Sequence, residues 1–204
     1  MRVLLAPIVA CVLIASSTTV AQSRLSGRTS RRLAPEARPA RVLEPQPAIP
    51  DVGLLTAQGH AVRLRDVLSA DRVVFVNFIF TSCTTICPVM SAAFSQFLAA
   101  LGSEADHVRL VSITINPGTD TPEVLDSYAK RYHARASWMF LTGTAADVEA
   151  VERAFGAYRG DPVNHEPVTY VRRAGRAEWE ALDGFSSVDR LFGALQVGST
   201  GSRF

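Results

Sequence analysis

Two cysteines stand four residues apart in a short polar loop, FTSCTTICP at residues 80–88. If the loop runs into a helix, the side chains of Cys83 and Cys87 lie on one face, about one turn apart. A thiol in the first helical turn is favoured as the thiolate, because backbone N–H groups and the helix dipole stabilise negative charge there. Such a pair suits disulfide exchange, with a Cys83–Cys87 disulfide as the oxidised form, or the binding of a soft metal ion. The plainer alternative is two buried cysteines that only pack.

A histidine, His165, lies in PVNHEPVTY at residues 162–170, just before a late hairpin. If this loop faces the cysteine loop across the end of a sheet, the imidazole approaches both sulfur atoms. Two cysteines and one histidine are a ligand set that suits copper. We therefore take Cys83, Cys87 and His165 as the candidate metal ligands. Met90 offers a thioether nearby, but core packing explains it better.

Strands and helices alternate along the chain around these residues. The run VVFVNFIF at 73–80 is β-branched and aromatic almost throughout, which is typical of a strand buried on both faces. The sequence DTPE at 120–123 is explained as the start of a helix. The other expected strands are 108–115 and 138–141, the expected helices 65–68, 88–101, 121–133, 145–155 and 187–195, and the expected hairpins 52–64 and 168–182.

This order predicts an α/β, thioredoxin-like sandwich in which helices flank a central mixed β-sheet. That fold places a paired-cysteine loop directly after the first core strand and before a long helix. The cysteine loop at 80–88 occupies this position in the chain.

The first 50 residues differ in composition from the rest. Residues 1–21 begin with Met-Arg, continue with an apolar run and end in small residues, which predicts a signal peptide or an N-terminal membrane anchor. Cys11 gives a weaker likeness to a lipoprotein processing site. Residues 22–50, rich in arginine and proline, are expected to form a flexible linker, and residues 51–204 the domain. The protein is thus expected to be exported, to the periplasm or the extracytoplasmic face of the membrane, with a membrane tether if the anchor is retained.

The net charge of +2 hides two unequal parts. The first 50 residues hold seven arginines and two acidic residues, so residues 51–204 carry 14 basic and 17 acidic side chains. A mildly acidic domain gives no reason to expect nucleic-acid binding. Three cysteines in 204 residues also exclude a disulfide-rich mini-protein, and 48% hydrophobic residues exclude a disordered chain.

Three segments together resemble the Sco/SenC family of copper chaperones for cytochrome c oxidase. They are FIFTSCTTICP at 78–88, VSITINPGTDTP at 111–122, and Asn-His at 164–165 ahead of a strand. The resemblance spans nearly all of residues 52–196, and its CxxxCP element is the specific part.

The resemblance implies that Cys83, Cys87 and His165 bind copper, as Cu(I) and Cu(II). It also implies that the protein delivers copper to the binuclear copper site of a cytochrome c oxidase subunit outside the cytoplasm, or keeps the cysteines of that site reduced. We expect a metallochaperone rather than an enzyme. One alternative is a thiol-disulfide oxidoreductase that acts on a periplasmic thiol protein through Cys83 and Cys87 without metal. Another is a thioredoxin-like binding module without metal chemistry.

Three positions depart from the family pattern. Asn116 and Asn164 stand where the family usually has aspartate, so two carboxylates expected near the site are missing. Pro167 occupies a position where thioredoxin-like proteins often carry a cis-proline opposite the cysteine pair. A cis bond before Pro167 would favour thiol chemistry, whereas a trans bond is an ordinary strand start.

Overall fold

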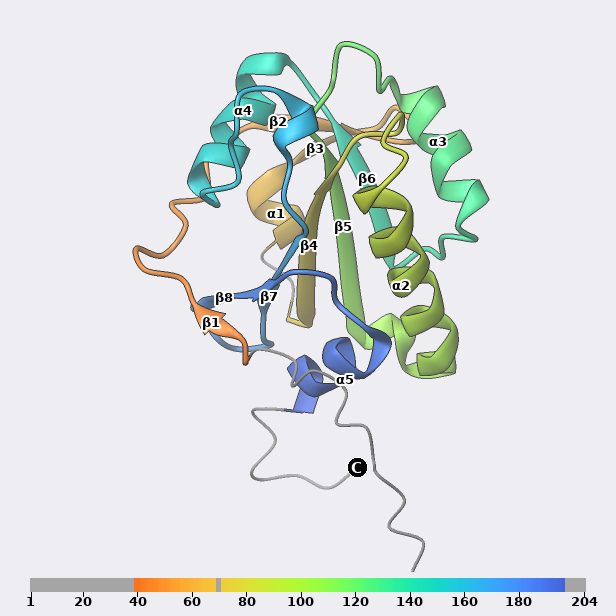
Figure 1. The fold of residues 1–204 in the computed structure, drawn as a ribbon, viewed down its shortest axis with the longest axis vertical. Coiled ribbons are helices and arrows are strands. Elements are labelled where there is room, and N and C mark those ends of the chain that lie inside the picture. The colour runs from red at the N-terminus through yellow and green to blue at the C-terminus, as the bar shows by residue number, and fades with distance from the viewer. Residues whose placement is uncertain (1–38, 69–70, 197–204) are drawn as a thin grey trace, which may run out of the picture. The chain divides into compact units, whose positions relative to one another are not determined.

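The computed structural model describes residues 39–68 and 71–196 (Figure 1). The expectations for residues 1–21 and for most of the predicted linker lie outside this part of the chain. The strands are β1 (Arg41–Val42), β2 (Gly53–Thr56), β3 (Ala61–Arg63), β4 (Val73–Ile79), β5 (Val108–Thr114), β6 (Trp138–Thr142), β7 (Val168–Arg172) and β8 (Trp179–Asp183). The helices are α1 (Leu64–Leu68), α2 (Ile86–Leu101), α3 (Pro122–Arg131), α4 (Ala145–Ala154) and α5 (Val188–Gln196), with 3-10 turns η1 (Gly102–His107) and η2 (Pro162–Asn164). The predicted elements are present, with ends that differ by up to two residues.

In the described residues the strands form one mixed sheet in the order β1-β8-β7-β4-β5-β6-β2-β3. Strands β4, β5 and β6 are parallel, whereas β7 runs antiparallel to β4 and pairs Thr169 with Asn77. The carboxyl ends of β4 and β5 therefore meet the beginning of β7 at one edge of the sheet. The predicted mixed sheet with flanking helices is confirmed, and this edge receives the cysteine loop.

Helices α2, α3 and α5 cover one side of the sheet, which we call the first face (Figure 1). Its core includes Phe75 and Leu110 from the sheet and Phe97, Leu125 and Leu191 from the three helices. Helix α2 contributes most because its apolar residues recur at helical spacing along the side that meets the sheet. With η1 it is also the one described helical stretch long and apolar enough to cross a membrane. Burial of its inner side against the sheet accounts for that composition.

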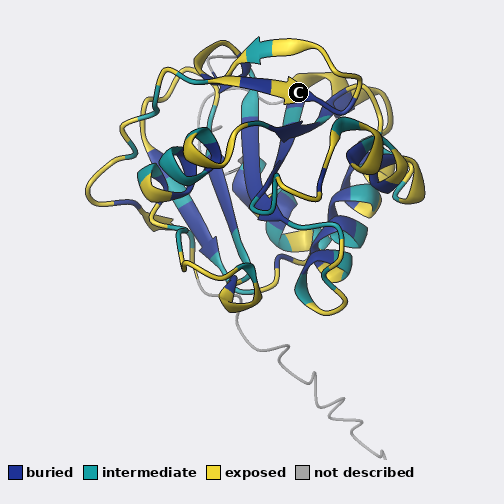
Figure 2. Ribbon diagram, turned by 90° about the horizontal axis from the view of Figure 1, so that it is seen from above, coloured by how far each residue is buried: buried dark blue, intermediate teal, exposed yellow. Residues whose placement is uncertain are grey.

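Helices α1 and α4 and the chain at residues 43–52 cover the other side, which we call the second face. Its centre is an aromatic cluster in which Phe78, Phe155 and Tyr170 are mutual neighbours, with ring centroids 4.9–6.0 Å apart. Phe155 also packs edge-on against Trp179. Figure 2 shows the resulting layers, with buried strands at the centre and exposed residues on the outer helices and loops.

Residues 41–46, at the end of the predicted linker, pack against the sheet and the second-face core. Arg41 pairs with Ala181 of β8 as part of strand β1. Leu43 is buried in the second-face core. The Gln46 side-chain oxygen accepts the Trp179 backbone N–H at 2.7 Å. Proline-rich sequence suggested an unpaired chain, but an edge strand tolerates nearby prolines because one side of it needs no partner.

Candidate functional site

The cysteine loop leaves the carboxyl end of β4 in a tight turn and enters α2. The Cys83 backbone N–H donates to the Phe80 carbonyl at 3.1 Å and closes the turn. Thr85, at the N-cap of α2, makes no capping bond with its side chain. The Cys87 backbone N–H, one of the helix's unpaired first-turn donors, instead donates to the Cys83 sulfur at 3.4 Å. The thiol therefore caps the helix, and the predicted approach of Cys83 and Cys87 is present in the structure.

The two thiols differ in environment. Partial burial of Cys83 would raise its pKa, but hydrogen bonds from the Cys87 and Thr85 backbone N–H groups outweigh it and leave the pKa below that of an ordinary thiol. Cys87 is fully buried in the first-face core, and this burial raises its pKa to about 12. Both cysteines are free thiols, so the Cys83–Cys87 disulfide remains a prediction for the oxidised protein.

His165 lies on the second face rather than beside the sulfur atoms. It is buried, and a small cavity beside it is lined by Phe78, Ala157 and Tyr170. Cys87, in contrast, belongs to the first-face core. The residues that the structure describes contain no group of three or more His, Cys, Asp or Glu side chains that could hold a metal ion. The expected approach of His165 to both sulfur atoms is therefore not found in this conformation.

The imidazole of His165 lacks a hydrogen-bond partner at one of its nitrogen atoms. Its Nε2 atom is buried and has no hydrogen-bond partner. Burial, with a smaller contribution from the positive charge of Arg159, lowers the pKa of His165 below its ordinary value. The backbone N–H of His165 donates to the Pro162 carbonyl, and an Arg159–Glu166 ion pair at 2.8 Å links the two ends of the segment. A local fold thus holds His165 in place, while its side chain gains no polar contact at Nε2.

The other residues singled out in the sequence have simpler roles. Among the described residues the cis peptide bond is Glu44–Pro45, so the bond before Pro167 is trans and Pro167 is an ordinary residue before β7. The trans bond removes the reason that Pro167 gave for thiol chemistry. Asn164 is exposed, Asn116 is partly exposed, and Met90 packs in the core as expected.

Sequence reasoning missed Asp120. The pattern at residues 120–123 indicates only a helix start, and Thr121 is indeed the N-cap of α3, since its side chain accepts from Val124 N–H. Asp120, however, is fully buried, and its carboxylate accepts hydrogen bonds from Thr81 in the cysteine loop. The available signal was position, because Asp120 follows β5, whose carboxyl end adjoins that of β4.

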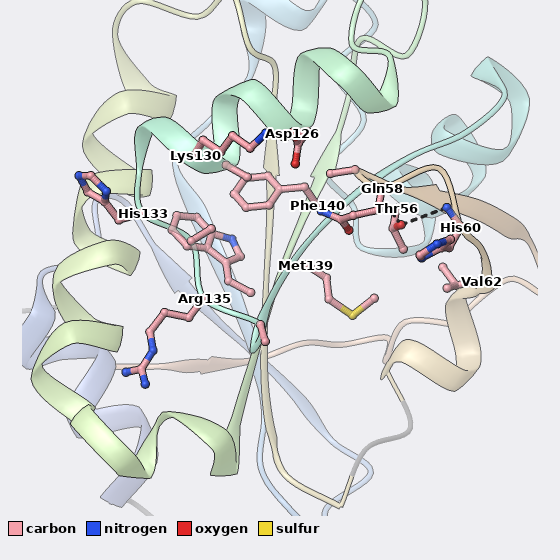
Figure 3. A pocket seen from close by; sticks show the side chains of 15 residues that line it. Thr56, Gln58, His60, Val62, Asp126, Lys130, His133, Arg135, Met139 and Phe140 are labelled. Atoms are coloured by element: carbon pink, nitrogen blue, oxygen red, sulfur yellow. Dashed lines mark hydrogen bonds and ion pairs between the residues drawn. The ribbon is translucent and has the colours of Figure 1, made fainter.

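A cavity of about 860 Å³ lies away from this site, between α3, β6 and the β2–β3 turn (Figure 3). Its lining includes Gln58, His60, Lys130 and Phe140, but none of the candidate ligands. Lys130 is held by Asp126 at 2.6 Å. The chemistry of the cysteine pair is therefore not associated with this cavity.

Comparison with known proteins places these features in a family. The family model described as SCO1/SenC matches residues 43–173. A SCO1 protein homolog of Bacillus subtilis is 40% identical over 68 residues, which are 33% of this chain and 35% of that protein. The chain is matched to its curated relatives over 30 to 55% of their own length.

Solved structures of Sco proteins have the same fold as this chain. BsSco, described as a member of the Sco family of cytochrome c oxidase assembly proteins, is 25% identical, with a TM-score of 0.63 over 79% of this chain and 99% of that one. ScoI of Bradyrhizobium japonicum, solved with copper bound, is also 25% identical, with a TM-score of 0.53 over 61% of this chain and 82% of that one. These neighbours share the thioredoxin-like fold predicted from the order of elements. With the cysteine loop inside the matched segment, the chain belongs to the SCO1/SenC family.

Proposed function

We propose that the protein binds copper through Cys83 and Cys87, with His165 as a third ligand, and delivers it to the binuclear copper site of a cytochrome c oxidase. The observation that carries the proposal is the thiol pair at the end of the sheet, with the Cys83 sulfur partly exposed and fixed by the Cys87 N–H. Family membership and the copper-bound ScoI relative support copper as the metal.

Two thiolates and one imidazole suit a metal ion that is passed to a partner rather than one that stays bound as a cofactor. Two thiolates favour Cu(I), an imidazole supports Cu(II), and three protein ligands leave a coordination position through which a partner can take the ion. Binding requires the Cys87 thiol to lose its proton, so copper must displace a proton that burial holds tightly. Ligation by His165 also requires the segment at 156–167 to carry this residue from the second face to the sheet end. Because Nε2 has no partner in the stored position, that movement breaks no side-chain hydrogen bond at this atom.

Copper titration of the full-length chain tests this proposal. Cu(II) is expected to give a thiolate-to-copper absorption band that is lost in Cys83→Ser and Cys87→Ser and weakened in His165→Ala. Cu(I), measured by competition with a coloured chelator, is expected to depend on both cysteines and less on His165, because thiolates dominate Cu(I) binding. His107→Ala, which removes an exposed histidine, is the matched control. An unchanged Cu(II) band in His165→Ala would remove His165 from the ligand set.

A second candidate function is thiol–disulfide exchange without metal, and the unequal thiols favour it. The Cys83 thiolate attacks a disulfide of a periplasmic thiol protein and releases one partner thiolate. Cys87, after losing its proton, then attacks the Cys83 sulfur of the mixed disulfide and releases the second. The result is a Cys83–Cys87 disulfide and a partner dithiol, a transfer of two electrons. Reduction of a model disulfide that persists in His165→Ala but needs both cysteines, in a protein that binds no copper, would favour this function.

We also infer that the protein works outside the cytoplasm, where its partner is the copper-receiving subunit of a cytochrome c oxidase or another periplasmic thiol protein. The basic start and apolar run of residues 1–21 support export. Cell fractionation followed by mass spectrometry of the N-terminus tests this inference and separates a cleaved signal from a retained tether. Recovery of the intact chain in the cytoplasm would contradict it.

A further inference from the structure

Asp120 is a fully buried carboxylate in the loop between β5 and α3. Its Oδ2 atom accepts hydrogen bonds from the Thr81 backbone N–H at 3.1 Å and from the Thr114 hydroxyl at 2.5 Å, and its Oδ1 atom accepts the Thr81 hydroxyl at 2.6 Å. The ion pairs of the described residues do not include it. Burying a carboxylate without a cation is costly unless its oxygens are hydrogen-bonded, so these three bonds account for its burial.

The bonds to Thr81 act on the cysteine loop. Thr81 is the second residue of the turn closed by the Cys83 N–H and the Phe80 carbonyl. That turn sets where the Cys83 sulfur meets the Cys87 N–H. Asp120 thus connects the end of β5 to the turn that carries the partly exposed thiol of Cys83. This contact is separate from the start of α3, where Thr121 supplies the cap.

We propose that Asp120 is a positioning residue for the thiol pair: its carboxylate holds the Phe80–Cys83 turn so that both sulfur atoms are arranged before copper arrives. This inference rests on the proposed copper function of the pair. A ligand set held in its bound geometry loses less conformational entropy when the ion binds. Without the carboxylate, the Thr81 N–H and hydroxyl lose their partner, the turn gains freedom, and the two sulfur atoms must be ordered by the metal.

Three variants of the full-length chain test the proposal. Asp120→Ala removes every bond, whereas Asp120→Asn keeps one oxygen that can accept the Thr81 N–H. Thr121→Ala is the matched control, because it removes the neighbouring helix cap but leaves the Asp120–Thr81 bonds. The measurements are Cu(I) affinity by chelator competition, hydrogen exchange of the Thr81 amide, and the melting temperature.

Asp120→Ala is expected to weaken Cu(I) binding about tenfold, equivalent to about 1.4 kcal/mol. Asp120→Asn should weaken it less, and both should speed exchange of the Thr81 amide. Thr121→Ala should lower the melting temperature yet keep Cu(I) affinity within about twofold of wild type. Unchanged affinity in Asp120→Ala, or an equal loss in Thr121→Ala, would overturn the proposal. If Asp120→Ala does not fold, Thr81→Val, which removes only the hydroxyl bond, is measured in its place. A loss of Cu(I) affinity of about threefold then supports the proposal, and no loss overturns it.

A metal-free measurement separates this inference from the proposed function. Glutathione disulfide oxidises the dithiol to the Cys83–Cys87 disulfide and yields two molecules of glutathione, so buffers of known ratio give an equilibrium constant. That constant should shift by threefold or more in Asp120→Ala and stay unchanged in Thr121→Ala, since only the first alters the geometry of the sulfur atoms. If wild-type protein binds no copper but this shift appears, the copper function fails and the positioning role stands. If no shift appears and copper binds normally, the positioning role fails and the copper function stands.

Discussion

The candidate ligands on the two faces of the sheet differ in how many contacts hold their donor atoms in place. On the first face, Cys83 is fixed by a turn, by the Cys87 N–H and, through Thr81, by Asp120. On the second face, His165 is buried against aromatic side chains with Nε2 unpartnered. The Cys83 sulfur is thus held by its own loop and by contacts around it, whereas the imidazole of His165 makes no polar contact at Nε2.

If the proposed copper site is correct, this difference gives its two halves different tasks. In the proposed function, the thiol pair captures Cu(I), or exchanges disulfides, without movement of the His165 segment. In the same proposal, the imidazole of His165 contributes only after its segment moves, so Cu(II) binding carries a conformational cost that Cu(I) binding does not.

Alkylation should distinguish the two thiols by the widest margin. At pH 7.5 a thiol with a pKa of about 12 is almost wholly protonated and Cys87 is also fully buried, whereas Cys83 is partly exposed with a lowered pKa. Iodoacetamide should therefore modify Cys83 at least about a thousand times faster, as read by mass spectrometry of timed samples. Both cysteines should react alike in denaturant. Comparable rates in the folded protein would show that the first face does not fix the pair as described.

Leu43→Ala should strongly destabilise the second face. Leu43 is buried in that core, so truncation should lower the free energy of unfolding by about 2 to 3 kcal/mol in urea titrations. Val42→Ala, on the neighbouring exposed residue, is the control and should cost below about 0.5 kcal/mol. Equal effects of the two substitutions on the free energy of unfolding would show that Leu43 does not stabilise the second-face core.

Much of the fold could be predicted from local patterns. The apolar run that became β4 and the polar loop before α2 are continuous in sequence, so their period and spacing indicate their structure directly. Strand β1 could not be found this way. It has two residues and pairs with β8, where Arg41 meets Asp183 across 142 positions of sequence. Only the tertiary structure creates that pairing.

The candidate site likewise has one feature that local sequence predicts and others that depend on tertiary structure. The contact between Cys83 and Cys87 depends on four residues of local geometry and was predictable. His165 lies in the loop between η2 and β7, so the side of the sheet on which it packs depends on how that loop folds against the rest of the domain. His165 shares its cavity with Tyr170 and Phe78 of the second face, and nothing in the composition of its loop indicates which face is chosen. Asp120 was missed for a related reason, since its partner Thr81 is 39 residues away.

A buried acid on the second face should give stability a pH dependence of its own. Burial, aided by the nearby Glu149, raises the pKa of Glu152 in α4 from 4.5 to about 7. The folded state therefore holds a proton that the unfolded state releases, and stability falls as the pH rises from about 4.5 to 7. Glu152→Gln should remove this fall and stabilise the protein at pH 8 by about 2 kcal/mol. Denaturant titrations at pH 5 and pH 8 measure the change, with exposed Glu178→Gln as the control. A pH dependence that survives in Glu152→Gln belongs to other groups.

The smallest expected effect concerns the ion pair that holds the histidine segment. Arg159 and Glu166 are substantially exposed, so Glu166→Gln should cost at most about 0.5 to 1 kcal/mol of stability. If His165 must leave the second face to bind Cu(II), loosening its segment should nonetheless speed the appearance of the thiolate-to-copper band about two- to threefold in stopped-flow mixing. Glu149→Gln removes a similar exposed pair, with Arg153 on α4, and should leave that rate unchanged. Cu(I) capture should be unaffected by either substitution, because it depends on the thiols that are already in place. If Glu166→Gln accelerated Cu(I) and Cu(II) binding equally, the His165 segment would not control Cu(II) binding alone. The distinction between a fixed thiol pair and an imidazole that must move would then be wrong.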